Sequence, residues 1–250
     1  MEQAYLNFHD SLNDFLAPSL QNQVIACNVN RRASIKDVIE SYNVPHTEID
    51  LIIVDGASVD FDYIVEASND IHVYPYHSAM DHAPRGLLHH LSPPLPPHPR
   101  FIIDVNLGRL ARYMRLLGFD CLYCNDFDDH SIAEISNKTQ RIVLSRDRKL
   151  LQRKMITYGY YVRTEIPKIQ VSEILNRFKL HALINPLTRC TKCNERLTKI
   201  EKHTIEHRLK PLTRQYYDKF LICTGCNQIY WQGSHHKRVT RLIQKFSGND

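Results

Sequence analysis

Short apolar runs in the first part of the chain predict a sheet. They occur at residues 4–8, 23–29, 51–54 and 71–74 and are separated by polar connections. Runs of this length, bounded by turn residues, are typical of strands. The run at 51–54 is apolar at every position, which indicates a buried strand.

A helix is predicted between the second and third of these strands. Ser34 and Asp37 resemble a capping box, in which the first side chain accepts a hydrogen bond from a backbone amide of the first helical turn. The apolar positions that follow lie on one helical face: Ile35, Val38, Ile39 and Tyr42.

This order of strands and helix over residues 1–80 resembles the ubiquitin-like β-grasp (α+β) fold of small sulfur-carrier proteins. Those carriers act through a flexible C-terminal Gly-Gly. Here the segment ends in Tyr74-Pro75-Tyr76, and Gly56 is the only glycine before Gly86. The resemblance therefore implies an adaptor that docks a protein partner, and it excludes carrier chemistry at this position.

Prolines gather after this domain. Six of the twelve prolines lie within residues 84–99, in a predicted linker at 81–99. Proline fixes φ and lacks the amide donor, so we expect this linker to be extended and semi-rigid. Five histidines between His77 and His98 are irregularly spaced, which favours adventitious over specific metal binding.

Strand and helix patterns alternate over residues 100–180. The predicted strands are 101–104, 119–124 and 141–144, and the predicted helices are 106–117 and one that begins at about 130. Alternation at this spacing is typical of a three-layer α/β domain with a parallel sheet. Gly118 follows the first helix, where a left-handed residue often ends a helix.

Aspartates follow each of these strands. Asp104 ends the first, Asp126, Asp128 and Asp129 follow the second, and Asp147 follows the third. Ligands of parallel α/β sheets bind at the carboxyl ends of the strands, and carboxylates that converge there repel one another unless a cation such as Mg²⁺ neutralises them. The alternatives are helix capping by Asp128 or Asp129, ion pairing of Asp147 with a neighbouring arginine, and a turn role for Asp104.

Two long motifs resemble the Mut-seven carboxy-terminal RNase family. They are Asp104-Val105-Asn106-Leu107-Gly108-Arg109-Leu110-Ala111-Arg112-Tyr113-Met114-Arg115-Leu116-Leu117-Gly118-Phe119-Asp120 and Arg141-Ile142-Val143-Leu144-Ser145-Arg146-Asp147-Arg148. The resemblance covers residues 100–236. It implies a PIN-like nuclease domain behind a ubiquitin-like domain, with RNA as substrate and Mg²⁺ or Mn²⁺ held by Asp104, Asp129 and Asp147. Asp120 also matches a family motif, but it begins a strand, so we interpret it as structural.

Basic residues near these acids are candidates for RNA binding. Arg109, Arg112 and Arg115 form an i, i+3, i+6 ridge on the predicted helix, where they could hold phosphates. A solvated helix face is the alternative. The candidate set also contains Arg146 and, in the basic tail next to aromatic residues, Lys237 and Arg238.

Two C-x₂-C pairs predict a zinc site. Cys190 and Cys193 form the first pair and Cys223 and Cys226 the second, with 29 residues between them. Four thiolates give a closed structural zinc site, so we expect a zinc ribbon at residues 181–250, with a hairpin containing Pro211 in the connection. Two disulfides are the alternative. We interpret the other cysteines as structural: Cys27, Cys121 and Cys124.

Charge divides the chain into two parts. Residues 1–99 hold 4 Lys and Arg against 13 Asp and Glu, whereas residues 100–250 hold 28 against 14. A basic C-terminal part that follows an acidic N-terminal part suggests that only the basic part contacts nucleic acid. The alternative is that two domains of opposite charge merely dock on each other. We find no apolar run long enough for a membrane span and no secretory signal, so we expect a soluble, cytoplasmic protein.

The sequence thus predicts a metal-dependent ribonuclease. It would carry Mg²⁺ or Mn²⁺ at the three aspartates and structural Zn²⁺ in the ribbon. A non-catalytic RNA-binding adaptor that uses the basic ribbon, with the β-grasp domain as a docking module, is the second hypothesis. A docking module for sulfur transfer to RNA is the third, and the missing Gly-Gly weakens it.

Overall fold

The computed structural model describes residues 2–76 and 89–232. These residues fall into two compact units. The first unit comprises the described residues within Met1–Pro96 and Asp128–Tyr161, and the second comprises those within Pro97–Phe127 and Val162–Asp250.

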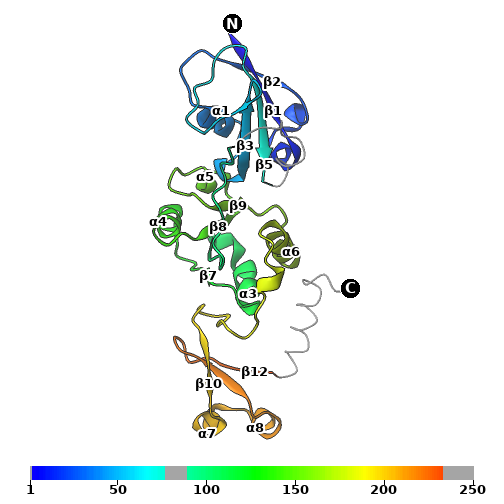
Figure 1. The fold of residues 1–250 in the computed structure, drawn as a ribbon. Coiled ribbons are helices and arrows are strands. Elements are labelled where there is room, and N and C mark those ends of the chain that lie inside the picture. The colour runs from blue at the N-terminus through cyan, green and yellow to red at the C-terminus, as the bar shows by residue number, and fades with distance from the viewer. Residues whose placement is uncertain (1, 77–88, 233–250) are drawn as a thin grey trace. The chain divides into compact units, whose positions relative to one another are not determined.

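A five-stranded mixed sheet forms most of the N-terminal part of the first unit (Figure 1). Its order is β2-β1-β5-β3-β4, with β1 and β5 parallel and the other pairs antiparallel. The strands are β1 (Gln3–Phe8), β2 (Ile25–Asn28), β3 (Ile49–Val54), β4 (Ala57–Ser58) and β5 (Asp70–Pro75). The four strands expected from the sequence are confirmed, and β4 is an additional short one.

Helix α1 (Ile35–Ser41) covers one face of this sheet. Ser34 is its N-cap, and Ser34 Oγ accepts a hydrogen bond from the Asp37 amide at 3.2 Å, as predicted. Burial alternates along β1, so that Ala4, Leu6 and Phe8 share one core with Ile35 and Ile39. The residues that alternate along strand β1 and the residues on one face of helix α1 therefore pack into a single apolar core.

The predicted linker is attached to this sheet where the structure describes it. Leu91 N donates to Asp50 O at 2.7 Å, His90 Nδ1 lies 2.8 Å from Asp50 Oδ2, and Ser92 N donates to Asp50 Oδ1 at 3.2 Å. Asp50 is 4% exposed and lies in β3, beyond the short pairing of β3 with β4. Residues 90–92 of the linker therefore lie along β3.

Parallel strand pairs, as the strand and helix alternation predicted, occur in both units. In the second unit β6 (Phe101–Ile103) pairs with β7 (Cys121–Leu122), and in the first unit β8 (Ile142–Ser145) pairs with β9 (Gly159–Tyr161). The predicted strand at 119–124 is shorter than expected. The Phe119 amide closes the preceding helix end by donating to Met114 O, and the Cys121 amide donates to Asn194 Oδ1.

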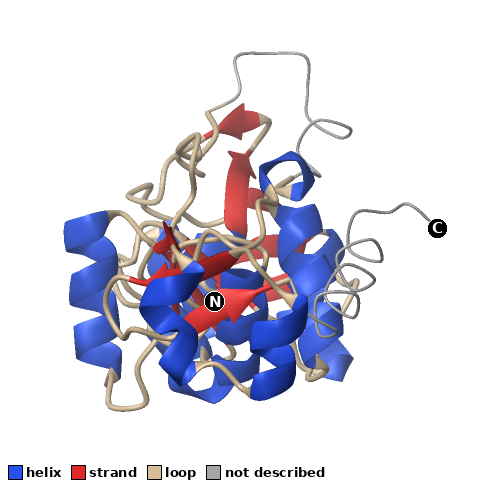
Figure 2. Cartoon of the chain, turned by 90° about the horizontal axis from the view of Figure 1, so that it is seen from below, coloured by secondary structure: helices blue, strands red, loops and turns tan. Residues whose placement is uncertain are grey.

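Four α-helices accompany these strands, and Figure 2 shows how large a share of the regular structure is helical. They are α3 (Gly108–Leu116), α4 (Asp129–Thr139), α5 (Arg148–Leu151) and α6 (Pro167–Arg177). The predicted helix at 106–117 begins with a 3₁₀ turn, η4 (Val105–Leu107), and continues as α3.

Gly118 ends α3 as expected. It has a φ of +97°, its amide donates to Arg115 O, and the Phe119 amide donates to Met114 O, which is the Schellman pattern. A Cβ at position 118 would lie 2.0 Å from Asn185 O. Both the backbone conformation and the close approach therefore require glycine here.

The C-terminal part of the second unit contains an antiparallel sheet of β10 (Leu197–Ile200), β11 (Phe220–Cys223) and β12 (Ile229–Trp231). The connection between β10 and β11 is not a plain hairpin loop. It contains two short helices, α7 (Lys202–Ile205) and α8 (Pro211–Tyr216), and Pro211 is the first residue of α8. Proline is favoured there because the first helical amide has no partner within the helix. No helix among the described residues is long and apolar enough to cross a membrane.

Candidate metal centre and candidate active site

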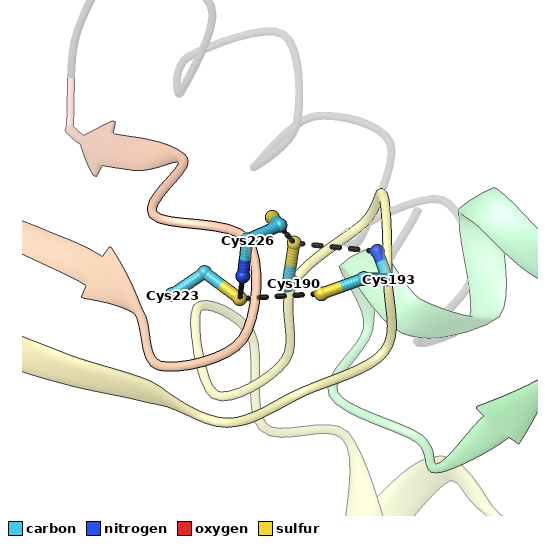
Figure 3. Close-up of side chains that lie close together, drawn as sticks. All are labelled: Cys190, Cys193, Cys223 and Cys226. Atoms are coloured by element: carbon cyan, nitrogen blue, oxygen red, sulfur yellow. Dashed lines mark hydrogen bonds between the residues drawn. The ribbon is translucent and has the colours of Figure 1, made fainter.

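Four cysteine sulfurs gather between the ends of two turns (Figure 3). The Sγ atoms of Cys190, Cys193, Cys223 and Cys226 all lie within 4.8 Å of one another. Two of the separations are 3.6 Å (Cys190 to Cys226) and 3.3 Å (Cys193 to Cys223). A tetrahedral zinc ion with Zn–S bonds of about 2.3 Å places its sulfurs about 3.8 Å apart, so these thiols fit zinc.

The two cysteine pairs have the same local structure. The Cys193 amide donates to Cys190 Sγ and the Cys226 amide to Cys223 Sγ, both at 3.4 Å. Each turn ends in an asparagine with positive φ, 73° at Asn194 and 56° at Asn227. This repeated turn aims both thiols of each C-x₂-C pair at a common point.

The thiols differ in how readily they lose a proton. Burial raises the pKa of Cys190, but hydrogen bonds from Tyr230 and from backbone amides outweigh it and lower the pKa to about 6. Burial and the hydrogen bond with Cys223 raise the pKa of Cys193 to about 12. The four thiols therefore do not all become thiolates together unless a cation compensates their charge.

Polar contacts attach this cysteine cluster to the rest of the second unit. Asp120 Oδ2 accepts from Arg189 Nη2 at 3.0 Å, and Asp120 Oδ1 accepts from Asn194 Nδ2 at 2.8 Å. Asn194 Oδ1 in turn accepts from the Cys121 amide at 2.9 Å. Asp120 thus joins the β7 region to the first cysteine turn, which agrees with its interpretation as structural.

Arg115 belongs to the same connection and does not lie on an open ridge. It is 4% exposed, and its guanidinium donates to the carbonyl oxygens of Cys121 (2.8 Å), Lys192 (2.9 Å) and Tyr123 (3.5 Å). Arg109 and Arg112 of the same helix are exposed. The structure therefore removes Arg115 from the candidate RNA-binding set and leaves Arg109 and Arg112 in it.

The first candidate acid lies at the end of a parallel strand. Asp104 directly follows β6, is 5% exposed and precedes η4, whose Leu107 amide donates to Asp104 O. It belongs to the second unit. Asp126, one of the alternatives, is exposed in the same unit, and Cys124 Sγ lies 3.8 Å from its Oδ2.

The third candidate acid ends a parallel strand of the first unit and caps a helix. Asp147 follows β8, and its Oδ1 accepts from the Lys149 amide at 2.7 Å and the Leu150 amide at 3.3 Å, which makes it the N-cap of α5. Among the described residues no hydrogen bond reaches Asp147 Oδ2. In the part of the chain that the structure describes, Asp147 forms no ion pair with a neighbouring arginine, which was the alternative to metal binding. Asp147 instead caps α5 through Oδ1.

The acids at the start of α4 divide into a cap and a first-turn residue. Asp128 Oδ1 accepts from the Ser131 amide at 2.8 Å and caps the helix, and its hydrogen bonds to Ser131 lower the pKa of Asp128. Asp129 is the first helical residue, with its Oδ2 3.6 Å from Arg153 Nη2. Asp128 is thus a helix cap, and Asp129 stays the predicted metal ligand of this group.

Within the described residues, the cysteines are the one set of three or more His, Cys, Asp or Glu side chains close enough to share a metal ion. Asp129 and Asp147 lie in the first unit and Asp104 in the second. Arg146 is partly exposed next to Asp147. Lys237 and Arg238 lie outside the described residues.

Sequence reasoning missed two residues of the metal centre. Tyr230 places its hydroxyl 3.1 Å from Cys190 Sγ and accepts from the Thr191 amide at 3.1 Å, although it stood in the sequence only as part of an aromatic tail. Asn194 directly follows the first C-x₂-C pair, as Asn227 follows the second. That repetition is the signal in the sequence from which a shared turn could have been predicted.

Comparisons with known proteins agree with these features. Residues 99–243 match the model of the Mut7-C RNAse domain, and residues 1–81 match that of the Mut7-C ubiquitin domain. No curated protein and no solved structure matches the chain.

The features and the matches define a nuclease-related protein with an N-terminal ubiquitin-like domain. The chain belongs to the Mut7-C RNAse domain family, as the resemblance in the two long motifs implied.

Proposed function

We propose that the chain is a metal-dependent ribonuclease that hydrolyses RNA phosphodiester bonds. The observation that carries the proposal is the match of residues 99–243 to an RNase domain, within which an aspartate directly follows strand β6 and another lies two residues after strand β8. The fold we propose for this domain is the PIN-like three-layer arrangement.

Asp104, Asp129 and Asp147 are the acids that would hold Mg²⁺ or Mn²⁺. Carboxylate oxygens are the ligands these ions prefer, and Asp147 combines a fixed position with an oxygen not used in capping. When bound, the cation activates water and neutralises charge on the scissile phosphate. The buried Asp104 supplies negative charge at a site shielded from water, where a cation is held more strongly.

RNA would be bound by arginines of the same domain that are at least partly exposed. Arg109 and Arg112 on α3 and Arg146 beside Asp147 are the residues we assign to phosphate contact. Lys237 and Arg238 would extend this contact. The four cysteines hold a structural zinc ion, because a closed set of four thiolates leaves no position for substrate.

Cleavage by protein stripped of divalent cations other than zinc tests the proposal. Mixed RNA is incubated with Mn²⁺, Mg²⁺ or no added metal, and retention of zinc is checked, because its loss unfolds small zinc domains. We expect cleavage only with added Mn²⁺ or Mg²⁺, and its loss in Asp104→Asn and Asp147→Asn. Cleavage that persists without added metal in these variants would contradict the proposal.

Single substitutions at the start of α4 distinguish its acids. We expect Asp129→Asn to lose cleavage and Asp128→Asn to retain it, because asparagine also caps helices. Glu134→Gln is the matched control, since Glu134 is an α4 carboxylate paired with Lys138 on the surface.

RNA binding without cleavage is the second candidate function. It is favoured by exposed apolar side chains on α8, where Leu212 is 69% and Tyr216 67% exposed beside the basic Lys210 and Arg214. Aromatic side chains next to cations stack on unpaired bases. Salt-sensitive binding that persists without added Mn²⁺ or Mg²⁺ while zinc is retained, with no cleavage under any metal, would support this function.

A further inference from the structure

The ubiquitin-like domain and residues 142–161 are joined by buried polar contacts within the first unit. Glu48 is 3% exposed, and its Oε1 accepts from the Tyr161 amide of β9 at 2.6 Å. His46 is 9% exposed, with Nδ1 2.7 Å from Glu40 Oε1 and Nε2 2.9 Å from Ile156 O. Buried polar groups with defined partners fix one arrangement, so this contact is specific.

Close packing accompanies these hydrogen bonds. A Cβ added to Gly159 would lie 3.0 Å from Thr47 Cγ2 and 2.9 Å from Leu151 Cδ2, so the backbone of β9 lies directly against η3 (His46–Glu48). Tyr161 also packs on the core of the ubiquitin-like domain, with its ring centroid 5.2 Å from that of Phe15.

Both ends of the short helix α5 are bonded to the ubiquitin-like domain. At its start, Arg148 Nη1 donates to Phe15 O at 2.8 Å, and the Arg148 Cζ lies 5.1 Å from the Phe15 ring centroid and 5.6 Å from that of Tyr161. At its end, Gln152 Nε2 donates to Glu40 O at 3.1 Å. A guanidinium between two rings is attracted to both.

Helix α5 is too short to be stable by itself. It has four residues, and helices below about 12 residues are marginal in water without tertiary contacts. Its N-cap is Asp147, whose Oδ1 accepts from the Lys149 and Leu150 amides. The position of the Asp147 carboxylate therefore depends on α5. This helix is held by its buried Leu150 and Leu151 and by the contacts of Arg148 and Gln152 with the ubiquitin-like domain.

We propose that the ubiquitin-like domain supports the active site in the same chain, with Arg148 as a positioning residue for Asp147 and Phe15 as its anchor. The proposal rests on the proposed function, because Asp147 must act in cleavage for its position to matter. It gives the N-terminal domain a role that needs neither carrier chemistry nor a second protein.

The test uses the full chain with Arg148→Met, Phe15→Leu and their combination. Amide hydrogen exchange of Lys149 and Leu150 reports the Asp147 cap directly, without any cleavage. We expect Arg148→Met to speed this exchange about tenfold, with exchange in β1 and α1 unchanged. Phe15→Leu keeps an apolar side chain in the core but removes the ring. We expect this variant also to speed amide exchange at Lys149 and Leu150.

Cleavage kinetics test the link to catalysis. In Arg148→Met the Mn²⁺ concentration for half-maximal cleavage should rise about tenfold and kcat should fall, with KM for RNA nearly unchanged, because a misplaced ligand weakens metal binding more than substrate binding. In these two measurements the double variant should equal Arg148→Met, since Phe15→Leu removes only the ring that Arg148 contacts and keeps the Phe15 carbonyl to which it donates. Lys154→Met, at an exposed lysine after α5, is the charge-matched control and should change neither measurement.

The outcomes separate the two proposals. Unchanged exchange at Lys149 and Leu150 in Arg148→Met would overturn the support role itself. Faster exchange with normal kcat and Mn²⁺ dependence would overturn the positioning of Asp147 for catalysis. A wild-type chain that cleaves no RNA with any metal would overturn the proposed ribonuclease, and with it the catalytic role of Arg148, while the exchange result would still decide whether the domain holds α5.

Discussion

The guanidinium of Arg115 donates a hydrogen bond to the carbonyl oxygen of Lys192 at 2.9 Å, although 77 positions separate the two residues. Lys192 lies within the first C-x₂-C turn, so this bond fastens α3 to the candidate metal centre. The other donors of Arg115 reach Cys121 O and Tyr123 O, which follow α3 in the chain. One buried side chain thus joins three segments of the second unit.

Removal of this guanidinium should destabilise the second unit. Burial lowers the pKa of Arg115, but a guanidinium keeps its charge, and Arg115→Met leaves buried carbonyls without donors. We expect the free energy of unfolding to fall by about 2–5 kcal/mol, as measured by denaturant titration. Arg112→Met, at an exposed arginine of the same helix, should change it by less than about 0.5 kcal/mol.

Zinc should be required for the fold of the ribbon. Among the described residues, the buried hydrophobic core of the ribbon contains Ile205, Phe220 and Ile229, with Ile200, Leu209 and Tyr217 packed against it. A core of this size is too small to hold three strands without a metal. We expect elemental analysis to find one zinc per chain, and chelation to unfold β10–β12 in hydrogen exchange while β1 stays protected. Cys193→Ser should lose the zinc and Cys124→Ser should keep it; a zinc content that falls in both would contradict the assignment.

Two substitutions at Asp147 should separate its cap from its proposed chemistry. Asparagine caps helices about as well as aspartate, so Asp147→Asn should keep the stability of the wild type, whereas Asp147→Ala should lose about 1 kcal/mol. Both should lower kcat at least about 100-fold if the carboxylate binds the metal. Thermal unfolding and single-turnover cleavage measure the two effects, and equal cleavage by Asp147→Asn and wild type would exclude the catalytic role.

Gly108 should tolerate no side chain while Tyr123 is present. A Cβ at position 108 would lie 2.5 Å from Tyr123 Oη, whose hydroxyl donates to Val105 O at 3.0 Å. We expect Gly108→Ala to lower the free energy of unfolding by about 1–3 kcal/mol. Addition of Tyr123→Phe removes the closest atom and should recover part of that loss in chemical denaturation; an alanine variant as stable as the wild type would contradict this packing.

Local patterns in the sequence predicted what neighbouring residues decide among themselves. The Ser34 cap, the Gly118 helix end and the two cysteine turns each depend on a few consecutive residues, whose hydrogen bonds close within one turn. The aspartates after β6 and β8 were predictable because a run of apolar residues that ends in polar ones marks the end of a strand. The metal that Asp104, Asp129 and Asp147 would share remains a prediction.

The tertiary structure decided what depends on distant partners. Arg109, Arg112 and Arg115 recur every three residues, but a helix turns about 100° per residue, so the third lies about 120° around the axis from the first. Only the fold shows that the cysteine turn covers that side and buries Arg115. The contact of Arg148 with Phe15, across 133 positions, left no pattern in either segment, because a cation and an aromatic ring far apart in sequence carry no periodic signal. The sequence determined the elements and the candidate chemistry, whereas the fold decided which charged side chains are free to meet a substrate and which hold the protein together.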